Sequence, residues 1–400
     1  MIRRLEVKGL NNRLDGEFEF NEDLNIFTGP NGSGKTTLLK LIWYFISGHL
    51  KQILYEIPFS YLSIEFDPFS IVMDRQTPEE LRLGFNFSSN RSREGGEQNI
   101  KIDPETRTIE EKNIKYVNQL EKRIAESSNE SLFFPTFRRI EGGFSIGSRS
   151  SVDTEDAAGL RLLSSTTERL LTALSQLSED MSSERHKFIV SVSTMDIIKI
   201  LPEKYVNIYQ EISNLQSQVL GKISKEIQSN PDRDKVGEIP KNASALLEAI
   251  QKVDKETEQL RKPFSVLSEL TRKILRYNAI LITEKLTLGE KTDDLAFGEE
   301  SDDIAIGEIN DAISSDKLSS GEKQMLSYLC YNAFYRDTAI FIDEPELSLH
   351  VDWQRILLPT LLEQATNNQF FIATHSPFIY TLYPDKEFML SDTRGYQGEV

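Results

Sequence analysis

The chain has 400 residues, of which 38% are hydrophobic and 27% charged, and this length predicts two or three structural units. Its net charge of −17 argues against a general nucleic-acid coat, although basic residues gathered in one place could still bind nucleic acid. The single cysteine, Cys330, excludes an internal disulfide, and no apolar run is long enough to span a membrane. We therefore expect a cytoplasmic protein without a membrane partner.

The first third of the chain predicts strands around one helix. Residues 2–9 and 17–27 alternate apolar and polar side chains, as strands do, and residues 33–46 place apolar side chains on one helical face. Short strand-like segments then predict a small, largely antiparallel β-layer, at residues 61–66, 81–87 and 99–102. The polar residues 88–98 predict a mobile hairpin tip, and a buried strand is expected to end at Pro135.

Helical periodicity dominates after about residue 150. The spacing of apolar residues predicts helices at 158–188, 203–229, 242–261 and 264–286. The second and third would form a hairpin with its tip near residues 230–240 and arms of about 30–40 Å. A projecting coiled coil and a hairpin folded into a globular lobe both explain this pattern. The acidic residues 289–303 predict a linker or an exposed loop.

A compact α/β pattern returns near the C-terminus. The predicted elements are a helix at 319–336, a strand at 339–342, a helix at 351–366, a strand at 370–373 and a strand at 387–390. The fold class is therefore predicted as α/β, in three segments: an N-terminal lobe at 1–150, a helical insertion at 151–300 with its hairpin near 203–261, and a C-terminal lobe at 301–400.

Residues 29–36, GPNGSGKT, match the phosphate-loop pattern GxxxxGK[ST] at every fixed position. Glycines let backbone N–H groups turn around an anion at the positive end of a helix. We expect Lys35 to reach the β- and γ-phosphates of ATP and the Thr36 hydroxyl to bind Mg²⁺. The other predicted nucleotide-binding residues of this loop are Gly29, Asn31, Gly32, Ser33, Gly34 and Thr37. A plain Gly-rich turn is disfavoured, because the expected strand and helix flank the loop.

Two later strands end in candidate catalytic residues. The apolar segment AIFI precedes Asp343 and Glu344, so Asp343 is expected to hold Mg²⁺ through water and Glu344 to activate the attacking water. His375 follows the strand at 370–373 and could reach the γ-phosphate or the water beside it. A lone histidine is more often structural, but the order of the motifs favours catalysis. The predicted catalytic set is Glu344, His375 and Lys35.

The segment LSSGEK at 318–323 opens a predicted helix and offers a hydroxyl and a helix N-terminus to phosphate. A simple helix cap, with an acid three residues after the serine, satisfies the same residues.

LSSGE resembles the ATP-binding-cassette (ABC) signature, normally LSGGQ. The order of phosphate loop, signature, IDEPE and TH resembles the branch that includes SMC, Rad50, RecF and OLD-type ATPases, over roughly the first fifty and last ninety residues. The resemblance implies an ABC-type ATPase head, with a phosphate-loop parallel sheet, an antiparallel β-layer and a helical insertion. It also implies a head-to-head homodimer that sandwiches two ATP molecules with Mg²⁺. In it, Ser319 and Gly321 would act on the partner's nucleotide, residues 347–350 would cross the interface, and Asn12 and Arg13 would touch nucleotide.

One part of the ABC pattern is missing. ABC heads place a glutamine on Mg²⁺ at the junction of the two lobes, whereas FFPTFRRIEGG at 133–143 contains none. Thr136, Arg138 or Arg139 could sense phosphate instead, or the segment could be structural, and the sequence leaves these alternatives open.

FFPTFRRIE, together with TGPNGSGKTTLLKLIWY and EPELSLHVDWQ, resembles the stand-alone AAA-family ATPases of bacterial antiphage systems such as PARIS and Septu. This implies a regulatory ATPase that controls a separate effector such as a nuclease. Only 25 residues follow His375, too few for the nuclease domain that OLD proteins append. The alternatives are a DNA-repair or chromosome-associated RecF/SMC-like ATPase, which the acidity disfavours, and a transporter subunit, which the helical insertion disfavours.

Overall fold

The structure is a computed structural model of the chain, and it describes residues 1–89, 92–103, 108–136, 139–140, 173–192, 194–229, 243–274, 278–282, 286–290 and 319–390. The chain divides into two compact units, Met1–Val192 with Tyr335–Val400, and Ser193–Phe334. The predicted boundaries near residues 150 and 300 lie outside the described residues, so the three predicted segments stay a prediction.

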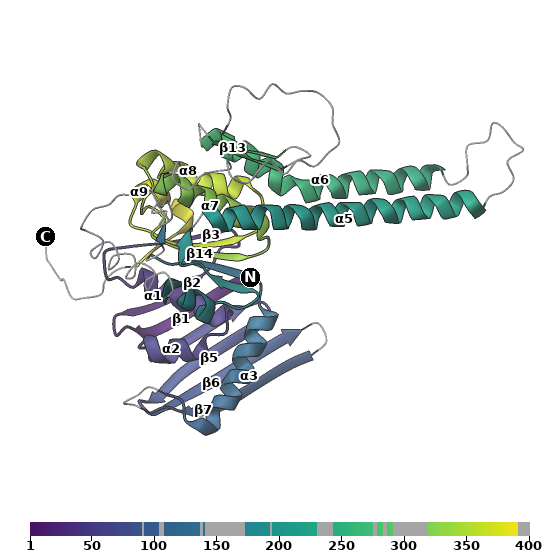
Figure 1. The fold of residues 1–400 in the computed structure, drawn as a ribbon. Coiled ribbons are helices and arrows are strands. Elements are labelled where there is room, and N and C mark those ends of the chain that lie inside the picture. Colours follow the sequence, from purple (N-terminus) through teal and green to yellow (C-terminus); the bar gives the residue numbers. More distant parts are fainter. Residues whose placement is uncertain are drawn as a thin grey trace, which may run out of the picture. The chain divides into compact units, whose positions relative to one another are not determined.

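A six-stranded antiparallel sheet makes up one layer of the first unit (Figure 1). Its order is β2-β1-β4-β5-β6-β7. The strands are β1 (Ile2–Leu10), β2 (Leu14–Glu19), β4 (Tyr61–Phe66), β5 (Phe69–Thr77), β6 (Glu80–Ser89) and β7 (Ser92–Lys101). The predicted antiparallel layer is thus confirmed, and strand alternation places one apolar face of this sheet in the core.

The hairpin predicted at residues 88–98 is present, but its predicted tip is too long, because Ser92–Lys101 form strand β7 and pair with β6. Ladder hydrogen bonds come from the backbone, so a polar, Gly-rich segment can pair when its partner strand is well packed. Gly96 lies opposite Phe85, and a Cβ at Gly96 would come within 2.8 Å of the Phe85 ring. The glycine therefore makes room for the aromatic side chain across the strand pair.

A six-stranded parallel sheet forms the second layer of this unit, in the order β10-β8-β14-β15-β3-β16. Its strands are β3 (Leu24–Thr28), β8 (Ser131–Phe134), β10 (His186–Phe188), β14 (Ala339–Asp343), β15 (Gln369–Ala373) and β16 (Glu387–Met389). The central strands are buried along their whole length, which explains their largely apolar sequences. The observed sheets confirm the predicted α/β class.

Two predictions fail in this region. Residues 17–27 are not one strand but parts of β2 and β3, which belong to different sheets. The helix predicted at 158–188 ends early, because residues 173–181 are helical but His186–Phe188 form β10. Residues 158–172 lie outside the described residues. Both errors arise because apolar spacing does not show where a chain turns between layers.

The helix α1 (Lys35–Ile46) is buried on nearly every side. Nine of its twelve residues are buried, and its apolar side chains share one core with residues of both sheets. The shorter helices of this unit are α2 (Leu50–Glu56), α3 (Glu111–Ser127), α8 (Val351–Glu363), α9 (Pro377–Tyr380) and the 3-10 turn η1 (Pro384–Lys386). A short parallel pair joins β9 (Arg139–Ile140) to β11 (Ser191–Val192). The central position of α1 fixes the loop that precedes it.

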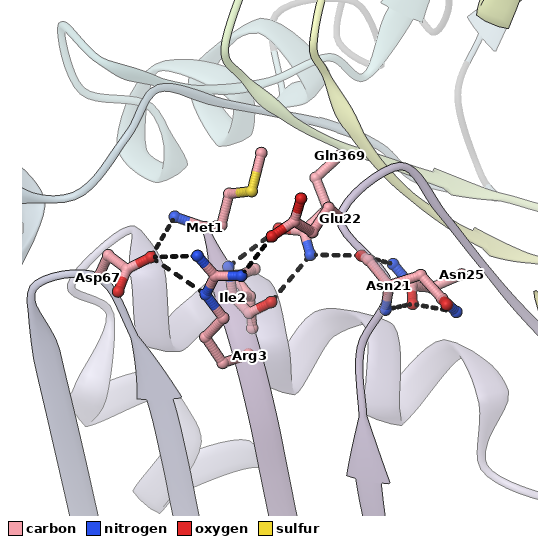
Figure 2. Close-up of polar contacts among 8 residues, drawn as sticks. All are labelled: Met1, Ile2, Arg3, Asn21, Glu22, Asn25, Asp67 and Gln369. Carbon is pink, nitrogen blue, oxygen red and sulfur yellow. Dashed lines mark hydrogen bonds and ion pairs between the residues drawn. The ribbon is translucent and has the colours of Figure 1, made fainter.

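The buried amide of Gln369 joins the two sheets (Figure 2). It accepts a hydrogen bond from the Ile2 N–H at 2.9 Å and donates to the carbonyl oxygens of Ile2 and Asn21 at 2.8 Å each. Arg3 adds an exposed ion pair to Asp67 at 3.2 Å, and such pairs contribute little. A buried backbone group without a partner costs about 1–3 kcal/mol, so the two bonds between Gln369 and the Ile2 backbone stabilise the link between β1 and β15.

The second unit contains two long helices that lie side by side, α5 (Thr194–Ser229) and α6 (Ala243–Ile274) (Figure 1). They contain 36 and 32 residues, which at 1.5 Å per residue gives arms of about 54 and 48 Å, longer than predicted. Figure 1 shows both running well beyond α7 (Ser320–Phe334), which favours a projecting hairpin over a globular lobe. The predicted tip at 230–240 lies outside the described residues.

The predicted break between helices at residues 261 and 264 is wrong, because α6 continues through Pro263. Proline removes one backbone hydrogen bond, but packing can offset that loss. The Phe264 ring lies 5.7 Å from Tyr205 and 4.8 Å from Phe334. The predicted helix also ends before 286, since Asn278–Ile282 and Leu286–Glu290 form the antiparallel strands β12 and β13. Most of the acidic segment 289–303 lies outside the described residues.

In the described part of the chain, no helix is both long enough and apolar enough to cross a bilayer.

A buried polar chain connects α1 to β8 and β10. The Trp43 Nε1–H donates to Ser131 Oγ at 3.0 Å, and that oxygen lies 2.8 Å from His186 Nδ1. The other ring nitrogen, Nε2, lies 3.0 Å from the Ala125 carbonyl oxygen. With the proton on Nε2, His186 donates to Ala125 and accepts from Ser131. Burial lowers the pKa of His186 to about 4, so this ring is neutral in the folded protein.

The neutral, buried His186 predicts that the folded protein loses stability in mild acid. An unfolded histidine has a pKa of about 6.5, so below that value the unfolded state binds a proton that folded His186 does not. Stability is therefore full above about pH 6.5 and falls as the pH drops toward 4. Between about pH 7.5 and 5.5, this residue should remove about 1.4 kcal/mol of unfolding free energy.

The measurement is urea unfolding, followed by tryptophan fluorescence, across that pH range. His186→Gln removes the titrating ring and should flatten the pH dependence by this amount, whatever it does to stability at neutral pH. An unchanged slope in His186→Gln would contradict the neutral, buried assignment.

Candidate nucleotide-binding and hydrolysis site

The phosphate loop connects the end of β3 to the start of α1. Gly29, Gly32 and Gly34 have φ of 137°, 82° and 97°, conformations that other residues rarely adopt. A Cβ on Gly29 would also lie 2.3 Å from a backbone oxygen. Gly34, the N-cap of α1, offers no side chain, so the N–H groups of the first turn can face an anion. Asn31 is exposed in this loop and Ser33 is buried.

The Lys35 ammonium is turned into the loop. Nζ donates hydrogen bonds to the carbonyl oxygens of Gly29 at 2.9 Å and Pro30 at 3.1 Å, and the residue is 5% exposed. Burial lowers the pKa of Lys35, while the charges of Glu344 and Asp343 oppose that shift. A buried cation held by neutral carbonyl oxygens is suited to an anionic ligand, and the β- and γ-phosphates of ATP would supply one.

The turn between β1 and β2 lies beside this loop. Arg13 Nη1 is 4.0 Å from the position that a Cβ on Gly32 would occupy, so the structure places the predicted Arg13 next to the phosphate site. The predicted Asn12 is exposed in the same turn. Sequence reasoning missed Asn11, whose Nδ2 donates to Thr37 Oγ1 at 3.0 Å. The repeated asparagine was a signal, since both residues adopt positive φ, where asparagine is tolerated.

Thr36 and Asp343, the predicted metal pair, lie in contact. Thr36 Oγ1 donates to Asp343 Oδ1 at 3.0 Å, and Asp343 is 1% exposed. Hydroxyl and carboxylate oxygens suit Mg²⁺, which in nucleotide sites is completed by water and phosphate. No cluster of three or more His, Cys, Asp or Glu side chains that could hold a metal ion occurs among the described residues. The donor set fits Mg²⁺ carried together with the nucleotide.

Glu344 begins the turn after β14 and faces His375. Its backbone has φ of 47°, and its N–H donates to the Ala373 carbonyl oxygen at 2.8 Å, which ties the turn to β15. Glu344 Oε1 lies 3.9 Å from His375 Nε2. Burial, followed by the charges of Asp343 and Glu346, raises the pKa of Glu344. A raised pKa makes this carboxylate a better proton acceptor near neutral pH, as a general base requires.

Glu346 is a second residue that sequence reasoning missed. Its carboxylate accepts hydrogen bonds from Thr374 Oγ1 at 2.8 Å and from the His375 N–H at 2.7 Å. It therefore fixes the turn that carries His375. The sequence shows an acid at this position, in the segment IDEPE, but no pattern in it marks the bonds to the histidine turn.

A cavity of about 490 Å³ lies beside the phosphate loop. Its lining residues are Thr28, Gly29, Pro30, Thr374, His375, Tyr380, Glu387, Met389 and Leu390. This volume is typical of small-molecule sites. The lining places His375 and the start of the phosphate loop on walls of the same space.

The signature segment belongs to the second unit, and Leu318 lies outside its described residues. The Ser319 N–H donates to Glu322 Oε2 at 2.7 Å, and the Glu322 N–H donates to Ser319 Oγ at 3.3 Å. This reciprocal pair is a capping box, the alternative that the sequence left open. Gly321 is buried in the first turn of α7, whereas Ser319 and Ser320 are exposed. Ser319 is thus an exposed residue even though its hydroxyl caps the helix.

Comparisons with known proteins bear on this site. The chain is 44% identical over 63 residues to the endonuclease GajA of Bacillus cereus (strain VD045), a match to 14% of this chain and 11% of that protein. It is 45% identical over 42 residues to the DNA double-strand break repair Rad50 ATPase of Methanopyrus kandleri, a match to 10% of this chain and 5% of that protein. The chain thus matches only small parts of these relatives.

A solved Smc head domain with an extended coiled coil, bound to the C-terminal domain of ScpA and derived from Pyrococcus furiosus, aligns with 95% of this chain and 91% of its own. The sequence identity is 13% and the TM-score is 0.35. The AAA ATPase domain family, in contrast, matches residues 1–380. The phosphate loop and the acidic strand end lie within that match, so the chain belongs to the AAA ATPase domain family and is an ATPase.

Proposed function

We propose that two copies of this ATPase close head to head around two Mg·ATP units, and that closure controls a separate effector protein. The main support is the start of α7. Ser319 and Ser320 are exposed there, while twelve residues of the helix behind them are buried. A firmly buried helix with an exposed, hydroxyl-bearing N-terminus is suited to meet a phosphate held by another chain. Gly321 would allow close approach at this point.

The turn after the acidic strand end supports the same arrangement. Leu347 is 43% exposed, and Ser348 has φ of 71°, in the segment that the ABC resemblance places across the dimer interface. His350 caps α8 and its side chain is also exposed. An exposed leucine next to catalytic residues is a reasonable contact for a second copy. Closure would then bring each signature to the other copy's nucleotide.

The proposed reaction is hydrolysis of ATP to ADP and phosphate. Lys35 would neutralise the β- and γ-phosphates, and Thr36 and Asp343 would carry Mg²⁺, which stabilises charge on the phosphate oxygens. Glu344 would take a proton from water as the water oxygen bonds to the γ-phosphorus and the bond to the β-phosphate oxygen breaks. His375 would orient that water or the γ-phosphate. Asn12 and Arg13 are kept as proposed nucleotide contacts.

The effector and the setting are inferred from sequence resemblance. FFPTFRRIE and EPELSLHVDWQ resemble the ATPases of antiphage systems, and an endonuclease is among the proteins with a similar segment. We propose a nuclease-type effector and a role in bacterial antiphage defence. The single, buried Cys330 suits a reducing compartment such as the cytoplasm.

A DNA-repair or chromosome-associated ATPase is the second candidate. The long, paired helices α5 and α6 favour it, because such hairpins are suited to reach a distant partner. The net charge of −17 disfavours extended DNA contact. Isolation of the chain with its genomic neighbours, with and without ATP, would separate the candidates: a co-purifying nuclease supports the first, and ATP-dependent capture of DNA alone supports the second.

Glu344→Gln should separate binding from hydrolysis. The amide keeps the shape of the side chain but cannot take the proton, so the hydrolysis rate should fall by roughly 10²-fold or more while ATP affinity is retained. Phosphate release measures the hydrolysis rate, and equilibrium binding of a fluorescent ATP analogue measures the affinity. Glu22→Gln, at an exposed carboxylate on the surface, is the matched control and should change neither. Normal hydrolysis by Glu344→Gln would exclude Glu344 as the base.

Ser319→Arg tests the proposed composite site. The long cation should block approach of α7 to the partner's nucleotide, so this variant should bind ATP at its own loop but not hydrolyse it. Lys35→Ala chains lack a working loop but keep an intact signature. A mixed dimer therefore contains one complete site, formed by the loop of the first chain and the signature of the second. Mixing should recover part of the activity that each variant lacks alone.

The control is Ser319→Ala, which removes the cap hydroxyl without adding bulk. It should weaken the start of α7 by about 1 kcal/mol yet close far better than the arginine variant. Rapid hydrolysis by Ser319→Arg alone would show that LSSGEK is only a helix cap. Inactive mixed dimers, verified by differently tagged chains, would argue against independent alternating sites.

A further inference from the structure

Asp343 accepts hydrogen bonds at both of its carboxylate oxygens. Thr36 donates to its Oδ1 at 3.0 Å from the start of α1, and Thr136 donates through Oγ1 to its Oδ2. An ionised carboxylate only accepts hydrogen bonds, and a buried one is costly unless donors satisfy it. The two threonines together meet that requirement at opposite oxygens. Thr36 belongs to the phosphate-loop pattern, whereas no pattern used above gives Thr136 this position.

The fold accounts for the position of Thr136. The strand β8 runs parallel to β14, with Phe134 opposite Ile342, so the residues after β8 emerge at the edge where Asp343 lies. Thr136 stands two residues beyond the end of β8. The buried chain through Ser131 and Trp43 holds β8 against α1, which carries Thr36. The spacing between the two hydroxyls is therefore set by packed elements rather than by a free loop.

This contact bears on the missing ABC glutamine. The sequence offered three substitutes, of which Arg138 lies outside the described residues and the side chain of Arg139 is likewise not described. Thr136 has a contact to the metal-bearing carboxylate itself. The side chain of Thr136 is shorter than a glutamine and contacts Asp343 itself, whereas the glutamine of ABC heads contacts the metal ion. Thr136 thus stands at the junction of the lobes and contacts the carboxylate instead of the metal.

We propose that Thr136 is a positioning residue of the Mg²⁺ site, an inference that rests on the proposed nucleotide site. Its hydroxyl donates to Oδ2 of Asp343 and fixes the carboxylate plane, so that Oδ1 faces Thr36 and the water shell of the metal. Hydrogen-bond partners of metal-bearing groups commonly set metal affinity by 10- to 100-fold. Thr136 therefore raises the affinity for nucleotide only when Mg²⁺ is present.

The test compares Thr136→Val, which keeps the shape and loses the hydroxyl, with Thr136→Ser, which keeps the hydroxyl. The affinity for a non-hydrolysable fluorescent ATP analogue is measured with excess Mg²⁺ and with EDTA, and the ratio of the two is the Mg²⁺ gain. Thr136→Val should lose about tenfold or more of this gain with an unchanged affinity in EDTA. Thr136→Ser should keep the gain within about twofold. Thr36→Val serves as the reference for loss of a metal-binding hydroxyl.

Action through Asp343 is tested by a double-mutant cycle. In the Asp343→Asn background, Thr136→Val should have little further effect on the Mg²⁺ gain, because the carboxylate it positions is gone. Additive losses would overturn the proposal, as would a full Mg²⁺ gain in Thr136→Val or equal losses in the valine and serine variants. If Thr136→Val fails to fold, Thr136→Ala takes its place with the same expectations. A parent chain that binds no nucleotide at all would instead refute the proposed site itself.

Discussion

The parallel register of β3, β15 and β14 is the constraint on which the site depends. Phe27 pairs with Ala373, and Ala373 with Asp343, so the carboxyl ends of the three strands reach one edge of the sheet together. The phosphate loop, the acidic turn and the histidine turn each begin at that edge. A shift of one residue in either pair would reverse the faces on which the buried side chains lie, and the apolar core opposes it. The catalytic groups therefore meet because the strands cannot slide.

Burial of charge gives this edge its chemistry. Lys35 and Asp343 are both nearly inaccessible, which raises the cost of each charge unless partners satisfy it. Carbonyl oxygens accept hydrogen bonds from Lys35, and the hydroxyls of two threonines donate hydrogen bonds to Asp343. A bound phosphate can take the place of the carbonyl oxygens, and a bound cation can take the place of a hydroxyl proton. Around them, α1 packs in the core shared by both sheets, and Gln369 ties those sheets together. Remote packing thus maintains the geometry at the strand ends.

Much of this arrangement could be predicted because it rests on local patterns. The glycines of the phosphate loop, the apolar strand before Asp343 and the strand before His375 each reflect a local conformational demand that the sequence displays. Long-range contacts leave no such trace. The sequence offered Thr136 only as one of three candidates at the lobe junction and did not show its bond to Asp343, and the pairing of polar β7 depends on Phe85 across the sheet. The continuation of α6 through Pro263 likewise depends on aromatic packing around Phe264.

The claim that these strand ends form one nucleotide site is tested most directly by the ATP affinity of Lys35→Ala. The ammonium is the buried cation directed into the phosphate loop, so its removal should abolish measurable ATP binding in a titration while the chain stays folded. Lys40→Ala, five residues later on the same helix, is the matched loss of charge and should bind ATP as the parent does. Unchanged ATP affinity in Lys35→Ala would contradict the site assignment.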